Sequence, residues 1–168
     1  MDKKIVLGTT EEGLKTLRTK SAVVSKITNE TRDLAETMLA SMHKAKGVGL
    51  SAVQIGVLQR VIVAEHGSNP TIEKFILVNP EVTWSSKKEV SDEEGCLSFP
   101  ELFGMVKRPE KIEYRGLDLD GNQISGKAGG LLARVIQHEI DHLNGVLFMD
   151  RVEDDLYTYE KQKNTEEL

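Results

Sequence analysis

Two histidines four residues apart, His138 and His142, form the part of this sequence best suited to chemistry, because Glu139 directly follows the first. Residues at i and i+4 of a helix project from successive turns as neighbours, so both imidazoles can bind one metal ion. In His-Glu-x-x-His sites the glutamate does not bind the metal; it takes a proton from the attacking water and delivers it to the leaving group. Buried histidines can also be satisfied by hydrogen bonds alone. This spacing beside a carboxylate favours a metal site.

A catalytic metal site typically has a third protein ligand and keeps one position open for water. His43 and His66 fall in a predicted helix and a predicted turn, and both are interpreted as surface residues. Cys96, the only cysteine, is the stronger candidate. Nearby acids Glu93 and Glu94 would raise the pKa of a free thiol, whereas a coordinated thiol is deprotonated outright. Taken alone, Cys96 could equally be a small buried apolar residue.

The residues around the histidine pair predict a helix that begins near Gly129 or Gly130 and ends at Asn144, before the stop signal Gly145. At about 100° per residue, the two histidines share an apolar face with Leu131 and Val135. The adjoining sector holds Leu132, Ile136, Ile140 and Leu143, and a polar stripe holds Arg134, Gln137, Asp141 and Asn144. We therefore expect a largely buried helix whose histidines point inward, with Asp141 serving structure.

The remaining pattern predicts an α+β fold with mainly antiparallel short sheets, packed around this buried C-terminal helix, plus an N-terminal helix. Helical spacing marks 28–46, with Thr28 or Asn29 as N-cap. The expected strands are 60–64, 75–78 and 111–119, and the expected hairpin turn is 120–122. Residues 1–168 are interpreted as a single catalytic domain, with 1–16 and 152–168 as terminal segments.

Composition narrows the class of protein. A net charge of −5, 39% hydrophobic residues and 29% charged residues indicate a globular chain without the uniformly basic surface of a nucleic-acid-binding protein. No apolar stretch is long enough to span a bilayer, and the first residues do not resemble a signal peptide. We expect a cytoplasmic protein with neither a membrane nor a nucleic acid as partner.

Three segments together carry a resemblance to a known family. They are Gly47–Gln54 (GVGLSAVQ), Glu94–Ser98 (EGCLS) and Gln137–His142 (QHEIDH), and they occur in this order. The sequence resembles the peptide deformylase family, which usually has alanine where this chain has Ser51. The resemblance implies that Cys96, His138 and His142 bind the metal and that Glu139 is the general acid and base. It also implies that the Gln54 side-chain amide and the Leu97 backbone N–H stabilise the oxyanion, a role suited to preorganised donors.

The implied reaction is hydrolysis of the N-formyl group from the methionine of N-formyl-methionyl nascent peptides, which releases formate. Val48, Leu131 and Val135 match the family's slot for the methionine side chain, although plain core packing is an equal alternative for each. Gly49 matches a position whose backbone binds the extended peptide, and by itself it could be a turn glycine. The implied cofactor is one divalent ion, Fe²⁺ in relatives, with Ni²⁺, Co²⁺ or Zn²⁺ able to substitute.

Two alternative functions are compatible with part of this pattern. A metallopeptidase with the same histidine motif would need a downstream ligand, and the glutamates after Asn144 (Glu153, Glu160, Glu166 and Glu167) lie in no helix with an apolar face. A non-enzymatic relative would have lost a catalytic group, yet all of them are present. The substrate implies transient proximity to the ribosome, and the acidic tail 152–168 lacks the basic helix through which some relatives dock there.

Overall fold

The computed structural model describes residues 2–67 and 72–159. Its helices are α1 (Glu11–Leu17), α2 (Asn29–Lys44) and α3 (Gly130–Leu143), with the short 3₁₀ helices η1 (Ala52–Ile55) and η2 (Phe148–Asp150). Its strands are β1 (Gly49–Ser51), β2 (Val61–His66), β3 (Glu73–Ser85), β4 (Glu89–Cys96), β5 (Phe99–Pro109), β6 (Lys111–Leu117) and β7 (Gln123–Gly129). The expected turn after His66 and three of the four tail glutamates, Glu160, Glu166 and Glu167, fall wholly or partly outside the described residues.

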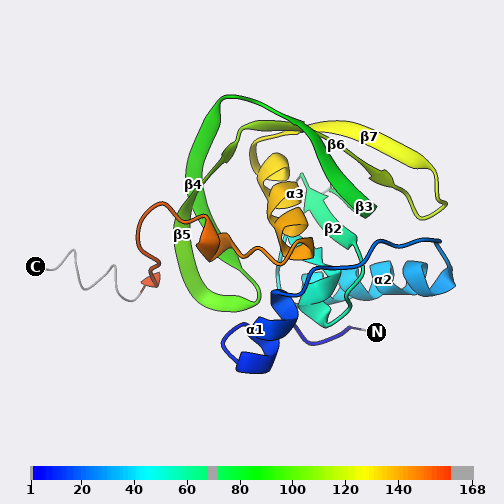
Figure 1. Ribbon diagram of the computed structural model, residues 1–168, viewed down its shortest axis with the longest axis horizontal. Coiled ribbons are helices and arrows are strands. Elements are labelled where there is room, and N and C mark those ends of the chain that lie inside the picture. Colours follow the sequence, from blue (N-terminus) through cyan, green and yellow to red (C-terminus); the bar gives the residue numbers. More distant parts are fainter. Residues whose placement is uncertain (1, 68–71, 160–168) are drawn as a thin grey trace, which may run out of the picture.

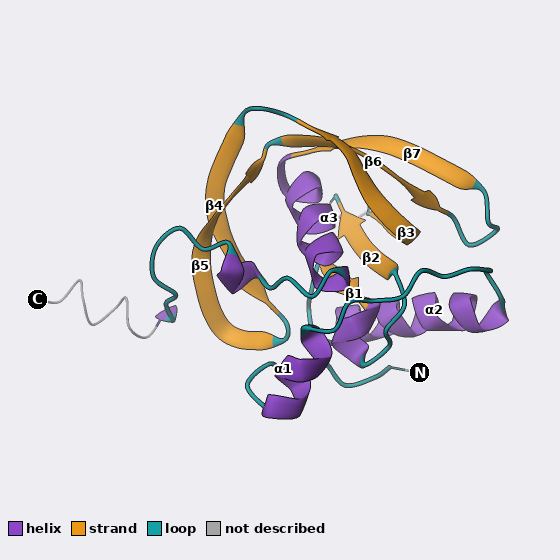
Figure 2. Ribbon diagram, in the orientation of Figure 1, coloured by secondary structure: helices purple, strands orange, loops and turns teal. Residues whose placement is uncertain are grey.

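The strands form two antiparallel sheets, which agrees with the expected α+β class. The larger sheet has the order β1-β2-β3-β6-β7, and β4 pairs with β5 in a separate hairpin. In Figure 2 the long strands β3, β6 and β7 curve over one end of α3, while the β4–β5 hairpin stands along its side. The expected strands at 60–64, 75–78 and 111–119 correspond to β2, part of β3, and β6. Gly121, with a φ of 85°, lies in the β6–β7 turn as expected.

The central helix α3 packs its apolar face on the larger sheet. Its residues Leu132, Ile136, Ile140 and Leu143 join Ile62, Leu77 and Ile112 of the sheet in one buried cluster. The helix ends where Gly145 takes a φ of 73°, and a Cβ at this position would come within 2.4 Å of the Arg18 carbonyl oxygen. On the adjoining face of the helix, His138 and His142 are also buried, at 9% and 1% exposed.

The second helix, α2, covers the sheet near β1 and β2. Thr28 is its N-cap, and Met38 and Met42 are fully buried with Leu50 and Val61 in a second cluster. The short helix α1 was not expected from the sequence. Its N-cap Thr10 accepts a hydrogen bond from the Gly13 N–H, which stabilises the first turn.

The hairpin of β4 and β5 is held from outside by the segment after η2. Val152 forms an isolated bridge with Val106, and Tyr157 forms another with Phe103. The Phe103 ring also contacts the rings of Tyr157 and Tyr159, with centroid distances of 6.4 and 4.8 Å. Within the described residues, no helix has the length and apolar character needed to cross a membrane.

Candidate active site

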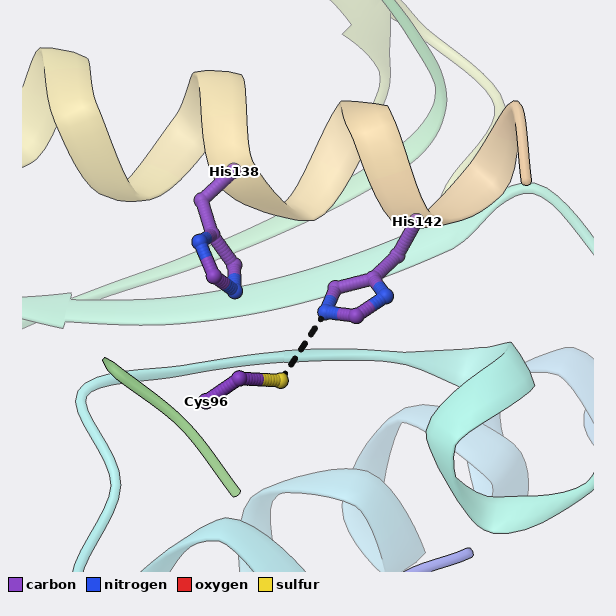
Figure 3. A group of neighbouring side chains, drawn as sticks. All are labelled: Cys96, His138 and His142. Carbon is purple, nitrogen blue, oxygen red and sulfur yellow. Dashed lines mark hydrogen bonds between the residues drawn. The ribbon is translucent and has the colours of Figure 1, made fainter. Parts of the chain in front are cut away.

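Three potential metal ligands from two distant segments meet between α3 and the β4–β5 hairpin. One donor atom from each of Cys96, His138 and His142 lies within 4.8 Å of the others. In Figure 3 both histidines project from α3 toward Cys96, and His142 Nε2 lies 3.3 Å from the Cys96 sulfur. The structure therefore brings together the three residues that the sequence nominated as ligands.

The donor set fits a divalent transition metal. One thiolate and two imidazoles are the ligand types of zinc, iron, nickel and cobalt sites. Burial, together with the positive charges of His138 and Arg108, holds the pKa of His142 well below its ordinary value, so this ring is neutral. A neutral imidazole is the form that binds metals. Burial also lowers the pKa of His138, but hydrogen bonds with Cys96 and Glu94 outweigh it and raise the net pKa, so these surroundings favour positive charge.

Glu94 orients the first histidine from behind. It lies on β4 two residues before Cys96, is 5% exposed, and faces the His138 Nδ1 atom at 3.0 Å. Because Nδ1 is engaged in this way, Nε2 is left to face the site, as in carboxylate–histidine–metal arrangements. Glu94 belongs to the second motif segment, but nothing in its sequence neighbourhood indicated this role.

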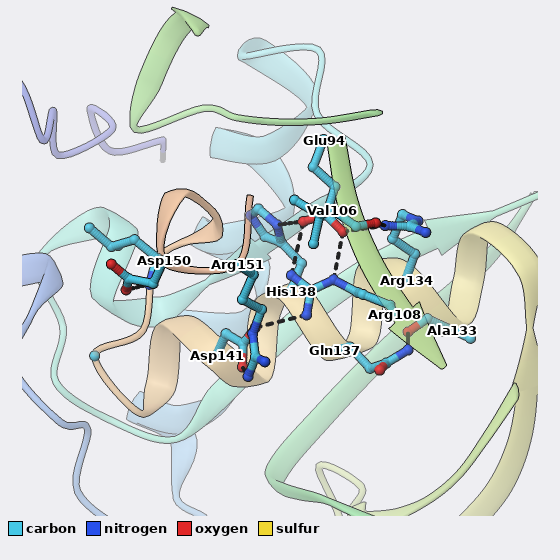
Figure 4. Close-up of polar contacts among 12 residues, drawn as sticks. Glu94, Val106, Arg108, Ala133, Arg134, Gln137, His138, Asp141, Asp150 and Arg151 are labelled. Carbon is cyan, nitrogen blue, oxygen red and sulfur yellow. Dashed lines mark hydrogen bonds and ion pairs between the residues drawn. The ribbon is translucent and has the colours of Figure 1, made fainter. Parts of the chain in front are cut away.

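Two buried arginines hold Glu94 in its charged form. Arg108 donates to it through Nε at 2.5 Å and Nη2 at 2.9 Å, and Arg134 donates through Nη1 at 2.8 Å (Figure 4). Burial alone would raise the pKa of Glu94, but the hydrogen bonds and charges of Arg108 and His138 outweigh it and keep that pKa far below its usual range. A carboxylate surrounded by donors is rigid, so it fixes the histidine ring.

Asp141 extends this ion network to the chain after α3. It accepts hydrogen bonds from Arg108 Nη1 at 2.8 Å and from Arg151 Nε at 2.6 Å. Asp141 and Arg134 are only 7% and 8% exposed, so the predicted polar stripe is partly a buried ion network. A helical wheel shows which side chains share a face and cannot show that Arg108 and Arg151 arrive from other segments to pair with them.

Glu139 lies beside the ligands, where it can exchange a proton. It is 4% exposed, and its Oε2 atom has no hydrogen-bond partner among the described residues. Burial raises the pKa of its carboxyl to about 7, against the opposing effects of His138 and Ser51. A carboxyl group with a pKa near neutrality can both accept and release a proton at physiological pH.

Gln54 reaches the same site from η1. Its Nε2 atom donates to the Cys96 sulfur at 3.5 Å and to Ser98 Oγ at 3.3 Å. The side chain is 1% exposed and belongs to the wall of the cavity. No role was predicted for Ser98 from the sequence. Its one distinguishing feature there is its place at the end of the segment Glu94–Ser98, two residues after Cys96.

A cavity of about 530 Å³ opens beside these residues, a volume in the range of small-molecule and peptide sites. Its lining includes all the predicted site residues except His142, which lies deeper and is 1% exposed: Val48, Gly49, Gln54, Cys96, Leu97, Leu131, Val135, His138 and Glu139. Val48 and Leu131 are 49% and 57% exposed, while Val135 is 7% exposed. The cavity thus has a polar end at the ligands and apolar groups along its side.

Gly49 is a glycine because β1 passes very close to α3. A Cβ at this position would lie 2.6 Å from Val135 Cγ1 and 2.7 Å from Glu139 Oε1. Any larger side chain would displace the Glu139 carboxylate or the cavity wall. Packing therefore requires glycine here, and this requirement holds with or without a peptide in the cavity.

Comparison with known proteins gives one consistent family. The sequence matches the model of the polypeptide deformylase family over residues 5–156. It is 45% identical over 145 residues to peptide deformylase 2 of Gloeobacter violaceus, covering 86% of this chain and 78% of the relative. It is 46% identical over 146 residues to the peptide deformylase of Dictyoglomus thermophilum, covering 86% of this chain and 92% of the relative.

Solved structures agree with the sequence relatives. The peptide deformylase of Thermotoga maritima has a TM-score of 0.84 at 33% identity, covering 92% of this chain and 99% of that one. A Synechococcus elongatus peptide deformylase in complex with actinonin has a TM-score of 0.78 at 41% identity, covering 83% of this chain and 75% of that one.

Proposed function

This chain belongs to the peptide deformylase family and removes the N-formyl group from newly made polypeptides, and we propose that Cys96, His138, His142 and Glu139 carry out that reaction. The observation that carries the residue assignment is the convergence of one thiol and two imidazoles at the polar end of the cavity, next to a buried carboxyl group. The family is metal-dependent, and this donor set would hold the ion.

The bound ion is Fe²⁺ in this proposal. When bound, such a cation supplies Lewis acidity that activates water at neutral pH and polarises the formyl oxygen. The donor types are compatible with Ni²⁺, Co²⁺ and Zn²⁺ as well. Metal analysis of anaerobically purified protein, paired with activity, tests the choice: full activity in a zinc-only preparation would contradict it.

Glu139 carries the proton through the reaction. Its carboxylate takes one proton from the water that attacks the formyl carbon. The carbon–nitrogen bond then breaks as Glu139 delivers this proton to the departing amine, and the formic acid that forms releases its own proton to solvent and leaves as formate. Its raised pKa, about 7, suits both steps.

Gln54 and Leu97 stabilise the negative charge that develops on the formyl oxygen. The proposed donors are the Gln54 Nε2 group, which points to the Cys96 side of the site, and the Leu97 backbone N–H, which follows Cys96 in the chain. Donors that are already aimed at the transition state require little reorganisation during the reaction.

The apolar part of the cavity would hold the methionine side chain. Val48, Leu131 and Val135 supply this surface, and the high exposure of Val48 and Leu131 leaves them free to contact a ligand. Gly49 lies on β1, the edge strand of the larger sheet, so its backbone can pair with an extended peptide. In this proposal the enzyme meets the nascent chain close to the ribosome, in the cytoplasm.

The test is a formate-release assay on a formyl-Met peptide with wild type, Glu139→Ala and Cys96→Ala. We expect Glu139→Ala to retain the metal and lose at least about 100-fold in kcat, and Cys96→Ala to lose the metal and with it the activity. His43→Ala is the control, because His43 is exposed and pairs with Glu65 outside the cavity.

Near-wild-type turnover by metal-loaded Glu139→Ala would overturn the proposed proton carrier. Cleavage of internal bonds in an unformylated protein substrate would instead support the metallopeptidase reading. The His43→Ala control should match wild type in both metal content and turnover.

A further inference from the structure

The Gln54 side-chain amide can be oriented in two ways, and only one of them suits its proposed role. A glutamine side chain has a donating NH₂ group and an accepting oxygen of almost the same shape. Only the orientation with NH₂ toward Cys96 can stabilise negative charge on a bound formyl group, since the reverse orientation would present an oxygen. Something in the protein must therefore distinguish the two ends of this amide.

The accepting end of Gln54 is fixed by a single residue, Ser51. The Ser51 backbone N–H and its hydroxyl both donate to Gln54 Oε1, each at 2.9 Å. Ser51 is fully buried and Gln54 is 1% exposed, so water does not compete for these contacts. The backbone N–H can only donate, so it selects the carbonyl end of the amide, and the hydroxyl adds a second hydrogen bond to the same oxygen.

The donating end has weaker partners. Gln54 Nε2 lies 3.3 Å from Ser98 Oγ and 3.5 Å from the Cys96 sulfur, and both contacts are longer than those to Ser51. Ser98 Oγ can accept or donate, so it does not distinguish the two ends of the amide. The selection therefore rests on the Ser51 backbone N–H, and the Ser51 hydroxyl stabilises the selected orientation with a second contact.

We propose that the Ser51 hydroxyl is a positioning residue for deformylation: it holds the Gln54 amide with its NH₂ group directed at the reacting formyl oxygen. The proposal rests on the oxyanion role of Gln54 given under Proposed function. The same hydroxyl also lowers the pKa of Glu139 through a hydrogen bond, so the experiments below separate an effect through Gln54 from one through Glu139.

Ser51→Ala is the direct test, since it removes the hydroxyl and keeps the backbone donor. We expect kcat for a formyl-Met peptide to fall about five- to tenfold, as for the loss of one buried hydrogen bond, with KM unchanged. Ser21→Ala is the matched control. Ser21 is 4% exposed and its hydroxyl has no hydrogen-bond partner among the described residues, so its removal should leave kcat unchanged.

A double-mutant cycle identifies the route of the effect. Gln54→Ala should lower kcat strongly, and Ser51→Ala should then cause no further loss in the Gln54→Ala background. In zinc-loaded protein with ¹⁵N-labelled glutamine, Ser51→Ala should also broaden or shift the Gln54 side-chain NH₂ signals, while Ser21→Ala should not.

Three outcomes overturn the inference, and they are distinguishable. If Gln54→Ala keeps wild-type kcat, the oxyanion role itself fails and the inference fails with it. If Gln54→Ala is impaired while Ser51→Ala is not, only the positioning role of Ser51 fails. If Ser51→Ala lowers kcat equally in both backgrounds, the hydroxyl acts through Glu139 and not through Gln54.

Discussion

Single side chains in this site act through their neighbours, and Glu94 is the clearest case. It receives hydrogen bonds from Arg108 and Arg134 and orients His138 at the same time. This pairing offsets the desolvation cost of the buried negative charge, since an unpaired buried carboxylate would be strongly unfavourable. One carboxylate therefore contributes both to folding and to the geometry of a ligand.

Glu94→Gln should weaken both functions. Removing one partner of a buried ion cluster typically costs about 3–5 kcal/mol of unfolding free energy, and loss of the carboxylate behind a ligating histidine lowers metal affinity about 10- to 100-fold. Urea unfolding and a competitive metal titration measure the two effects.

Glu81→Gln is the control for this substitution. Glu81 pairs with Arg115 at the surface, where both side chains are more than half exposed, so the loss should be below about 1 kcal/mol. Equal losses in the two variants would mean that the cluster around Glu94 has no special contribution.

At the scale of elements, the β4–β5 hairpin depends on the segment that follows η2. Tyr157 and Tyr159 both donate hydroxyl hydrogen bonds to Glu93 of β4, and Tyr157 bridges the backbone of Phe103 on β5. Glu93 and Phe103 line the cavity. The wall of the substrate site is thus supported by a part of the chain outside it.

The Tyr157–Glu93 contact predicts a specific titration. The hydrogen bond to Glu93 is the first cause that raises the pKa of Tyr157 from 10.0 to about 12. Because the folded-state pKa is raised, the contact stabilises the segment fully below pH 10 and is lost as the pH rises toward 12. A ¹³C NMR titration of the tyrosine ring carbons should place Tyr157 near 12 in wild type.

Glu93→Gln should move this pKa back toward 10, because the charge that disfavours the tyrosinate is gone. Tyr114 lies away from Glu93 and is the internal reference, since burial is the first cause of its own raised pKa. A Tyr157 pKa that stays near 12 in Glu93→Gln would contradict the assignment.

The joint between α3 and α1 allows a second prediction at this scale. Gly145 has a φ of 73° and no room for a Cβ beside the Arg18 carbonyl, whereas Gly121 has a φ of 85° and open space around it. Gly121→Ala should therefore cost only backbone strain, about 1 kcal/mol, and Gly145→Ala should cost more because of the added clash. Thermal unfolding of the two variants separates the cost of backbone strain from the cost of the clash. Equal decreases in melting temperature would show that the clash is relieved without cost.

Sequence periodicity predicted α2 and α3 well, because each has a long apolar stripe. It missed α1, whose seven residues are too few to show a stripe, and the strands β1, β4 and β5. In β4 the residues Glu89–Glu93 are all exposed, so no alternation of apolar and polar residues marks the strand. The predicted ligands meet at one point, as the spacing of His138 and His142 indicated. The pairing of Arg108 and Arg134 with Glu94 could not be predicted, since it joins residues 14 and 40 positions apart in the chain.

At the scale of the whole molecule, the ligands join two parts of the fold. Cys96 ends β4 in the hairpin, and His138 and His142 lie on α3, which packs on the larger sheet. A metal bound by all three would connect the hairpin to the central helix. Binding to the folded state alone stabilises a protein by RT ln(1 + [L]/Kd), where [L] is the free ligand concentration.

Removing the metal should therefore lower the melting temperature. At a free metal concentration about 100 times the Kd, binding contributes about 2.7 kcal/mol, which corresponds to a shift of roughly 5–10 °C for a chain of this size. Thermal unfolding with and without a chelator measures the shift. Cys96→Ala, which lacks a ligand, should be insensitive to the chelator. An unchanged melting temperature for wild type would mean that the ion does not connect the two parts.

The placement of Glu94 and Cys96 two residues apart on β4 also limits how genes for this fold can change in length. Glu94 faces His138 and Cys96 faces His142, and a one-residue shift in a strand turns a side chain to the opposite face. A single codon inserted or deleted between these positions would separate the ligand from the carboxylate that orients its partner histidine. Divergence should therefore proceed here by substitution, with insertions and deletions confined to turns such as 86–88 between β3 and β4.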